Sequence, residues 1–170
     1  MPGNSKKAPV KTKRGLKKTK RRNASELNVD AVNHHLLCSP TYIGTIIMKS
    51  FKTMIIQTQN FSFVVSCGNH FFAVYCTPES FEIFDSLGFL KSKDCVSKHM
   101  IHFINSHMIS RNLCVNHPVQ HDNSKLCGYF VIYFIKLRDS GKTFDQIMKT
   151  FYKDKRKNND LVMNVVNKRN

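Results

Sequence analysis

Residues 61–84 have the sequence FSFVVSCGNHFFAVYCTPESFEIF, and this stretch decides the fold that we expect. Two short segments rich in turn-forming residues, Gly68-Asn69 and Thr77-Pro78-Glu79, interrupt it. The runs that they separate are rich in aromatic and β-branched residues and cover 61–67, 70–76 and 80–84. Strand-forming runs joined by such short turns are typical of β-hairpins. The stretch therefore predicts an antiparallel meander of three strands.

Downstream of the meander, the sequence predicts two helices with a further strand between them. Residues 94–108 carry apolar side chains at a spacing of three to four, which indicates one buried helix face. These side chains are Val96, Met100, Phe103, Ile104 and Met108. Leu113-Cys114-Val115 is short enough for a strand, and the long apolar stretch 126–138 favours a buried helix that closes near Gly141. We therefore expect the α+β class, with an antiparallel or mixed central sheet and flanking helices.

The two ends of the domain give weaker patterns. Ser25 and Asp30 are candidate helix starts, and residues 39–51 have the pattern of a short helix or loop followed by apolar packing. Thr143 and Gln146 form a T-x-x-Q capping box in front of a helix with an apolar face. Residues 153–160, with the sequence KDKRKNND, are expected to form a solvated charged turn or a fraying end.

The positive charge of the chain is concentrated at its N-terminus. The formal net charge is +16, and residues 1–22 contain ten lysines or arginines and no acidic residue. A segment with like charges, Pro and Gly and no apolar periodicity cannot bury enough surface to fold. We therefore expect a disordered basic tail over residues 1–24 and a single domain over residues 25–170.

The basic tail is expected to bind DNA without sequence specificity, because clustered cations neutralise phosphates and release counterions. The residues expected to make these contacts are Lys11, Lys13, Arg14, Lys17, Lys18, Lys20, Arg21 and Arg22. Two other interpretations of the tail are a nuclear-localisation signal and a solubilising extension.

The chain of 170 residues contains six cysteines, from which we expect neither a disulfide framework nor a metal site. No secretory h-region follows the N-terminal charges, and no apolar run reaches membrane-spanning length. We therefore expect an intracellular protein with reduced thiols, not secreted and not bound to a membrane. No C-x₂₋₄-C pair is present and the histidines are scattered, so no metal is expected.

One cysteine, Cys127, occupies a position that favours reactivity. If a helix starts at about Leu126, the thiol lies in its first turn, where unpaired N–H groups and the helix dipole favour an anion. Gly128 leaves backbone room beside the sulfur, and the Cys127 N–H can face an oxyanion. Gln120, seven residues upstream, can supply a second donor without pairing with a thiolate. The alternative interpretation is that Cys127 is a small core residue of an apolar helix.

A nucleophilic cysteine needs a base and a group that orients the base, and the meander offers both. His70 opens the second strand, and Asp85 follows the third. If these strands are antiparallel, position 70 pairs near position 85 or 86, so the two side chains can meet at one end of the sheet. Taken singly, His70 could instead be a turn histidine and Asp85 a turn cap.

These residues resemble the adenovirus-type (adenain-like) cysteine endopeptidases and, more distantly, the SUMO-specific proteases that share their fold. Four segments occur in the order of that family: LLCSPTYIGTI (36–46), GNHFFAVYC (68–76), FEIFDSLGF (81–89) and VQHDNSKLCGYFVIYF (119–134). The resemblance implies a cysteine protease fold of the adenain type, related to papain by a permuted order of elements. It implies His70 as the base, Asp85 as its orienting acid, Gln120 as an oxyanion donor and Cys127 as the nucleophile.

The resemblance also implies substrates, activators and a location. It implies a viral thiol protease, a hydrolase with no cofactor for its chemistry, that acts as a monomer in the host nucleus or the virion and matures precursor polypeptides at small-residue sites such as Gly. DNA and an activating peptide are the implied activators. Cys114 resembles the cysteine that pairs with such a peptide, although a buried strand residue is the alternative.

Two other functions fit the sequence. One is a protease that removes SUMO or ubiquitin-like proteins from their conjugates, because Asp85 matches the acid of the SUMO-specific proteases whereas adenovirus enzymes tend to have Glu. The other is a catalytically inactive, basic structural protein that binds nucleic acid through its tail.

Overall fold

The computed structural model describes residues 26–48, 59–88, 98–108 and 111–168. These residues form five strands: β1 (Tyr42–Ile47), β2 (Phe61–Ser66), β3 (Phe71–Cys76), β4 (Ser80–Phe84) and β5 (Asn112–Val115). They also form five helices: α1 (Val29–Leu36), α2 (Lys98–Met108), α3 (Cys127–Asp139), α4 (Phe144–Met148) and α5 (Lys155–Val166).

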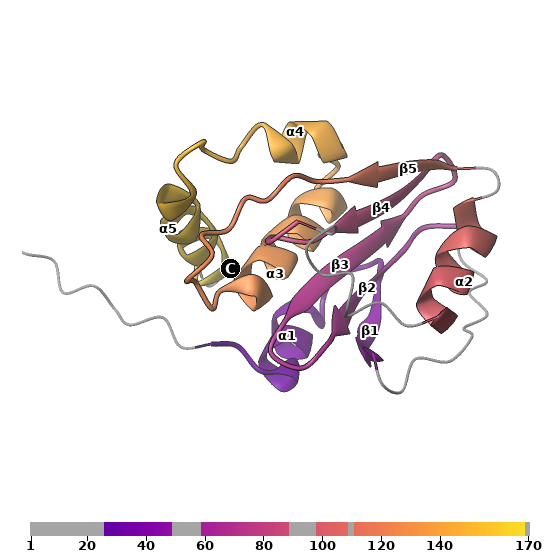
Figure 1. Ribbon diagram of the computed structural model, residues 1–170, viewed down its shortest axis with the longest axis horizontal. Coiled ribbons are helices and arrows are strands. Elements are labelled where there is room, and N and C mark those ends of the chain that lie inside the picture. The colour runs from indigo at the N-terminus through magenta and orange to yellow at the C-terminus, as the bar shows by residue number, and fades with distance from the viewer. Residues whose placement is uncertain (1–25, 49–58, 89–97, 109–110, 169–170) are drawn as a thin grey trace, which may run out of the picture.

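The strands form one mixed sheet in the order β1-β2-β3-β4-β5 (Figure 1). Strands β2, β3 and β4 are antiparallel neighbours, so the predicted meander is confirmed. Strand β1 runs parallel to β2, and β5, which contains the strand predicted at 113–115, runs parallel to β4. The predicted α+β class with a mixed sheet and flanking helices is therefore confirmed.

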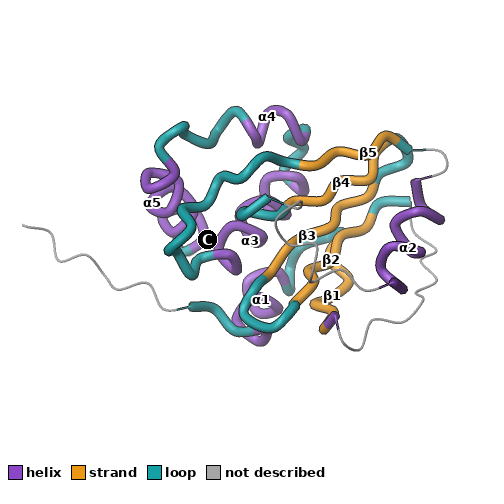
Figure 2. Tube along the Cα trace, viewed as in Figure 1, coloured by secondary structure: helices purple, strands orange, loops and turns teal. Residues whose placement is uncertain are grey.

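Helices cover both faces of this sheet and create two hydrophobic cores (Figure 2). On one face, apolar side chains of α1, α3, α4 and α5 form the larger core with Val64, Ala73 and Phe84 of the strands. On the other face, α2 packs its apolar stripe on β2, β3 and β4. Both sides of β2 and β3 are therefore buried, which explains why β3 is a continuous apolar run and why β2 is apolar apart from the buried Ser62 and Ser66.

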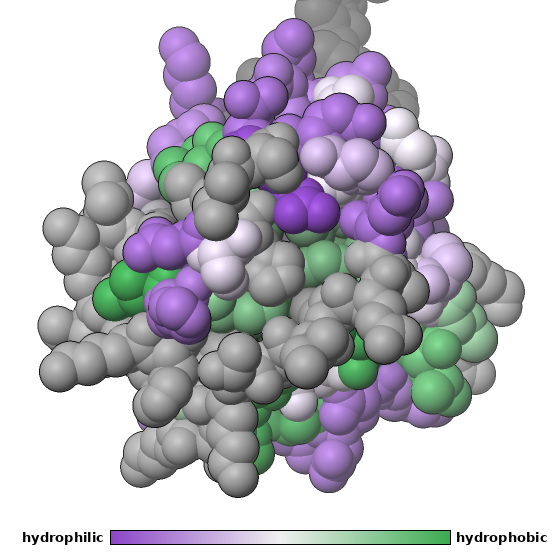
Figure 3. All heavy atoms as spheres, turned by 90° about the vertical axis from the view of Figure 1, so that its right-hand side faces the viewer, coloured by the Kyte–Doolittle hydropathy of each residue, from purple (hydrophilic) through white to green (hydrophobic). Residues whose placement is uncertain are grey.

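Helix α2 forms the outer layer on the second face. Met100, Phe103 and Ile104 of the predicted stripe are buried, whereas Ile101 between them is about half exposed. Figure 3 views the molecule from this side, where hydrophobic side chains reach the surface in separate places among polar ones. The predicted helix start at 94 lies outside the described residues, which place Lys98 to Met108 in the helix.

Helix α3 is the central element of the larger core. Every residue from Cys127 to Ile135 is buried, which accounts for the long apolar stretch in the sequence. The helix ends at Asp139, and Gly141 adopts a φ of 88°, so the predicted closure near this glycine is confirmed. The capping box of Thr143 and Gln146 is also present and starts α4.

The N-terminal part of the domain differs from the prediction. Residues 42–47 form strand β1 at the edge of the sheet, where a short helix or loop is expected from the sequence. The β-branched sequence YIGTII suits a strand once β2 offers a partner, and the Ser62 N–H donates to the Thr41 carbonyl at 2.8 Å. Helix α1 starts after Asn28, whose side chain accepts from the Ala31 N–H at 2.8 Å, and Asp30 lies in its first turn.

The C-terminal part also differs from the prediction. The charged segment expected to be a turn or fraying end contains the start of helix α5, with Asp154 as its N-cap. Asn158, Val162 and Val166 recur every four residues and are all buried, so only a narrow stripe of the helix faces the core. The stripe begins with a polar residue, which is why the apolar pattern is weak in the sequence.

The basic tail predicted over residues 1–24, with its eight candidate DNA-binding cations, lies outside the described residues. Within the described ranges, no helix is both long enough and apolar enough to cross a bilayer. The same ranges contain no group of three or more His, Cys, Asp or Glu side chains arranged to hold a metal ion.

Candidate active site

His70 and Asp85 meet at one end of the sheet, because they flank neighbouring antiparallel strands. His70 directly precedes β3, Asp85 directly follows β4, and the Nε2 atom of His70 lies 2.9 Å from Oδ1 of Asp85. The predicted pairing of position 70 near position 85 or 86 lies beyond the last paired residues of β3 and β4. Ala73 pairs with Phe84, and this register, if continued, sets His70 opposite Leu87 rather than position 85 or 86. Asp85 is therefore a diagonal neighbour of His70, which long side chains can still reach.

The Asp85 carboxylate is fully buried, and its surroundings hold it in one orientation. The Leu87 N–H donates to its Oδ1 at 2.9 Å. Asn116, directly after β5, accepts from the Asp85 N–H at 2.8 Å and donates to the Asp85 carbonyl at 2.7 Å. The Asn116 side chain thus extends the contact between β4 and β5 beyond the last paired residues. These contacts direct the carboxylate toward the imidazole.

Cys127 is the first residue of α3, so the predicted position of the thiol in the first turn is confirmed. The N-cap residue, Leu126, has an apolar side chain that makes no capping hydrogen bond, and the first turn contains no acidic residue. The unpaired N–H groups and the helix dipole favour negative charge at this position. No carboxylate in the first turn offsets that effect. Cys127 is only 3% exposed, and its Sγ lies 3.9 Å from the carbonyl oxygen of Asn69, the residue before His70.

The imidazole of His70 interacts with both the carboxylate and the thiol. Burial lowers the pKa of His70, but hydrogen bonds to Asp85 and Cys127, together with the charges of these groups, raise the pKa to about 10 from its usual 6.5. Because Nε2 contacts Asp85, Nδ1 is the ring nitrogen left for the sulfur. The ring is therefore expected to carry a proton at neutral pH, and it lies between the Asp85 carboxylate and the Cys127 sulfur.

Gln120 joins this region through Ser86, the residue after Asp85. Gln120 is 1% exposed, and its backbone N–H and that of Val119 both donate to the Ser86 carbonyl, at 2.8 and 2.9 Å. The Ser86 hydroxyl donates to Oε1 of Gln120 at 2.6 Å, while Nε2 donates to the Ser124 carbonyl at 2.6 Å. These contacts orient the side-chain amide and use one of its two N–H groups. The second N–H is the donor that an oxyanion would need.

Gly128 has a packing role that the sequence interpretation missed. A Cβ atom at this position would lie 3.0 Å from Cβ of Leu27 and 3.4 Å from Cγ2 of Val32. The space that a Cβ of residue 128 would occupy is thus filled by Leu27 and by Val32 of α1. Gly128 therefore allows close packing of α1 on α3, and its expected role beside a substrate carbonyl stays a prediction.

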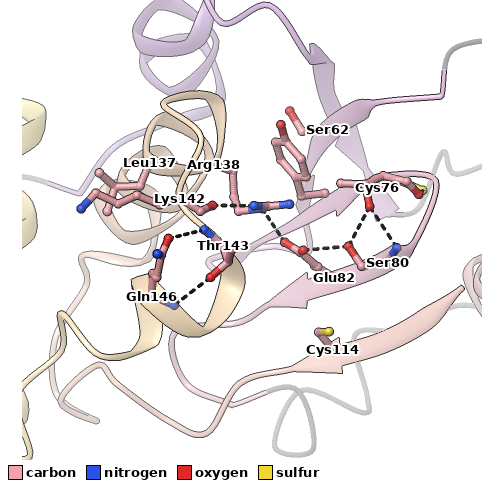
Figure 4. A network of polar contacts seen from close by, with 12 residues as sticks. Ser62, Cys76, Ser80, Glu82, Cys114, Leu137, Arg138, Lys142, Thr143 and Gln146 are labelled. Carbon is pink, nitrogen blue, oxygen red and sulfur yellow. Dashed lines mark hydrogen bonds and ion pairs between the residues drawn. The ribbon is translucent and has the colours of Figure 1, made fainter.

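Cys114 lies apart from these residues, beside a buried ion pair at the other end of α3 (Figure 4). Arg138 Nε lies 2.8 Å from Glu82 Oε2, an ionic contact that is not aligned as a hydrogen bond. Arg138 and Cys127 occupy opposite ends of α3, which are about 16 Å apart at a rise of 1.5 Å per residue. Burial, and then the charges of Glu82 and Asp145, raise the pKa of the Cys114 thiol. The structure therefore brings together His70, Asp85 and Cys127 and links Gln120 to this group through Ser86, whereas Cys114 lies beside Glu82.

Three residues of the site have no predicted role from the sequence: Asn69, Ser86 and Asn116. Asn69 and Ser86 are chain neighbours of His70 and Asp85, so their contacts follow from the local backbone. Asn116 has one available signal, because it is the first polar residue after the strand predicted at 113–115. Since β5 runs parallel to β4, the residues that follow these two strands lie side by side.

Comparisons with known proteins assign no family to this chain. No protein-family model matches the sequence, and no curated protein matches it significantly. Among solved structures, the chain is similar to the central domain of the uncharacterized protein Lpg1148 from Legionella pneumophila, with a TM-score of 0.45 and 14% sequence identity. That similarity covers 74% of this chain and 82% of the other.

Proposed function

We propose that the chain is a cysteine endopeptidase with a fold of the adenain type, in which Cys127 is the nucleophile and His70 carries the proton. The observation that carries the proposal is the position of the His70 ring, whose Nε2 lies 2.9 Å from the buried Asp85 carboxylate and whose pKa is raised by interactions with both Asp85 and Cys127. The uncapped start of α3 supports a thiolate at Cys127. Asp85 is the proposed orienting acid and Gln120 the proposed oxyanion donor.

The reaction that this arrangement suits is acyl transfer. The Cys127 thiolate attacks the carbonyl carbon of a peptide bond, and the electron pair of the C=O bond moves to the oxygen. The Cys127 N–H and the second N–H of Gln120 donate to that oxyanion. When the C–N bond breaks, the His70 imidazolium gives its proton to the leaving amine and a thioester remains. Water then attacks the thioester, His70 takes a proton from the water, and the thiolate is released.

The proposed substrates are proteins cleaved after small residues such as Gly, as the family resemblance implies. Virion precursors and ubiquitin-like conjugates both offer such sites, and a fluorogenic peptide panel with Gly before the scissile bond can include both types of sequence. DNA and an activating peptide are proposed activators, so the panel is run with and without duplex DNA.

The first test is selective alkylation of the purified chain by iodoacetamide, read by peptide mass spectrometry. Although Cys127 is buried and Cys38 is exposed, the proposed nucleophile Cys127 should react faster at neutral pH, because it lies at the start of α3 beside the His70 ring. Preference for Cys38 would overturn the proposal. Cys127→Ala should abolish cleavage of any peptide that the panel identifies, and the matched variant Cys38→Ala should cleave normally. Cleavage that survives in Cys127→Ala would also overturn it.

A further inference from the structure

Asn158 on helix α5 is a fully buried polar residue in a segment that the sequence predicts to be solvated. Its side chain satisfies three backbone groups. Oδ1 accepts from the Tyr152 N–H at 2.7 Å, and Nδ2 donates to the Tyr152 carbonyl at 3.1 Å and to the Val119 carbonyl at 2.8 Å. The contacts with Tyr152 stabilise the turn before α5. The contact with Val119 reaches a different part of the chain, 39 residues away in sequence.

The Val119 contact falls directly before the proposed oxyanion donor, Gln120. On one side of this segment, the N–H groups of Val119 and Gln120 both donate to the Ser86 carbonyl. On the other side, Asn158 donates to the Val119 carbonyl. The backbone at 119–120 is therefore held between the end of β4 and helix α5.

A second contact links α5 to Ser124, the residue that accepts a hydrogen bond from the Gln120 side chain. Ser124, whose carbonyl accepts from Nε2 of Gln120 at 2.6 Å, donates through its hydroxyl to Oδ1 of Asn159 at 3.4 Å. Asn158 thus contacts the backbone before Gln120. The next residue, Asn159, contacts Ser124, which binds the amide nitrogen of Gln120. Such contacts restrain the backbone before Gln120 and the residue that accepts a hydrogen bond from its amide.

We propose that Asn158 is a positioning residue, which places the Gln120 amide where the oxyanion forms. The inference rests on the proposed function, because it assigns a role within the same site. It also explains why a polar residue begins the otherwise apolar buried stripe of α5. An apolar residue would leave the Val119 carbonyl buried without its donor. The segment 119–120 would then be free to move by a fraction of an ångström, enough to misplace a donor.

The test compares two reagents that act on the same sulfur. Iodoacetamide alkylates Cys127 by displacement at a saturated carbon, so no oxyanion forms. A peptide aldehyde ending in glycinal adds the sulfur to its carbonyl carbon and places the oxygen in the oxyanion site. The rate of alkylation is measured by mass spectrometry of the full chain, and the dissociation constant of the aldehyde is measured from its protection of Cys127 against iodoacetamide.

Asn158→Ala should weaken aldehyde binding by about tenfold to a hundredfold, because the donor is misplaced rather than removed. Its alkylation rate should stay within about twofold of wild type, because His70 and the start of α3 beside the sulfur are unchanged. Asn164→Ala, an exposed position on the same helix, is the matched control and should change neither quantity. Equal loss of both quantities, or no loss of either, in Asn158→Ala would overturn the positioning role.

Combining the variants separates positioning from general damage to the fold. In a Gln120→Ala background, Asn158→Ala should cause no further loss of aldehyde affinity, since the group that it positions is already absent. Additive losses would overturn the inference. If Asn158→Ala does not fold, Asn158→Asp is used for the same comparison, because it keeps the side-chain volume and the acceptor for the Tyr152 N–H. Failure of both variants to fold would assign Asn158 to stability alone. Preference of iodoacetamide for Cys38 in the wild type would instead mean that the proposed function has failed.

Discussion

The Nε2 atom of His70 lies 2.9 Å from the buried carboxylate of Asp85, and the two residues flank neighbouring antiparallel strands. The pairing of β3 with β4 therefore sets their separation. Since this contact occupies one ring nitrogen, the other is available to Cys127, which starts a helix packed on the same sheet. One hairpin and one helix end are thus enough to assemble the three groups.

Replacing Asp85 by Asn should lower the pKa of His70, because the negative charge is lost while an acceptor is kept. In the wild type, kcat/KM should fall at high pH as His70 loses its proton near its pKa of about 10. In Asp85→Asn this fall of kcat/KM at high pH, the alkaline limb of the pH profile, should occur about one to three pH units lower. The pH dependence of kcat/KM measures the shift. Asp160→Asn, at an exposed position, is the control, and an unmoved limb in Asp85→Asn would contradict the pairing.

The same pKa shift makes stability depend on pH. The pKa of His70 rises from 6.5 to about 10 on folding, so its stabilising effect is complete below pH 6.5 and is lost as the pH rises toward 10. His70→Gln cannot titrate. The free energy of unfolding of the wild type should therefore fall, relative to that variant, by a few kcal/mol across this window, at about 1.4 kcal/mol per pKa unit. Urea unfolding on both sides of the window measures this difference, and a constant difference would show that the ring gains no proton affinity on folding.

The central part of the fold could be predicted from the sequence because its signals are local. The runs 61–67, 70–76 and 80–84 match β2, β3 and β4 closely, and the apolar stretch 126–138 is α3 displaced by one residue. In these segments apolar pattern, turn residues and capping residues all indicate the same element. The predicted meander alone indicates that His70 and Asp85 meet. It does not indicate the register of β3 against β4.

The parts that could not be predicted depend on partners distant in sequence. Residues 42–47 become a strand because β2 lies beside them, and Gly128 packs on Leu27, about a hundred residues earlier. Asn158 contacts the Val119 carbonyl across the larger core, and nothing in the local sequence KDKRKNND indicates that contact. Such contacts are decided by the tertiary structure, so local patterns do not reveal them.

Replacing Arg138 by Met should destabilise the fold strongly. Glu82 is 3% exposed and Arg138 11% exposed, and the guanidinium also lies 4.6 Å from the centre of the Tyr75 ring. Arg138→Met would leave the Glu82 carboxylate buried without its cation, at a cost of about 3–5 kcal/mol. Adding Glu82→Gln should recover part of this loss, because the buried charge is then removed as well. Urea unfolding measures both effects, with the exposed Lys149→Met as control.

That variant also separates stability from chemistry. Since Arg138 and Cys127 lie at opposite ends of α3, the folded fraction of Arg138→Met should alkylate Cys127 at the rate of the wild type. A slower rate in fully folded protein would mean that the ion pair affects the thiolate from a distance.

The last prediction concerns Gly128, for which the sequence and the structure suggest different roles. In Gly128→Ala the new Cβ would lie 3.0 Å from Cβ of Leu27, closer than ordinary contact, so α1 must shift. The resulting overpacking should destabilise the fold by about 1–3 kcal/mol, measured by urea unfolding. Adding Leu27→Ala removes the atoms beyond that Cβ and gives α1 freedom to adjust, so the double variant should be more stable than the sum of the two single changes predicts. Leu27→Ala alone is the control for the cavity that this second change creates. If the double variant regains stability and also binds the glycinal aldehyde like wild type, Gly128 serves packing alone. Recovered stability with weak aldehyde binding would contradict this conclusion and restore the role of Gly128 beside the substrate carbonyl.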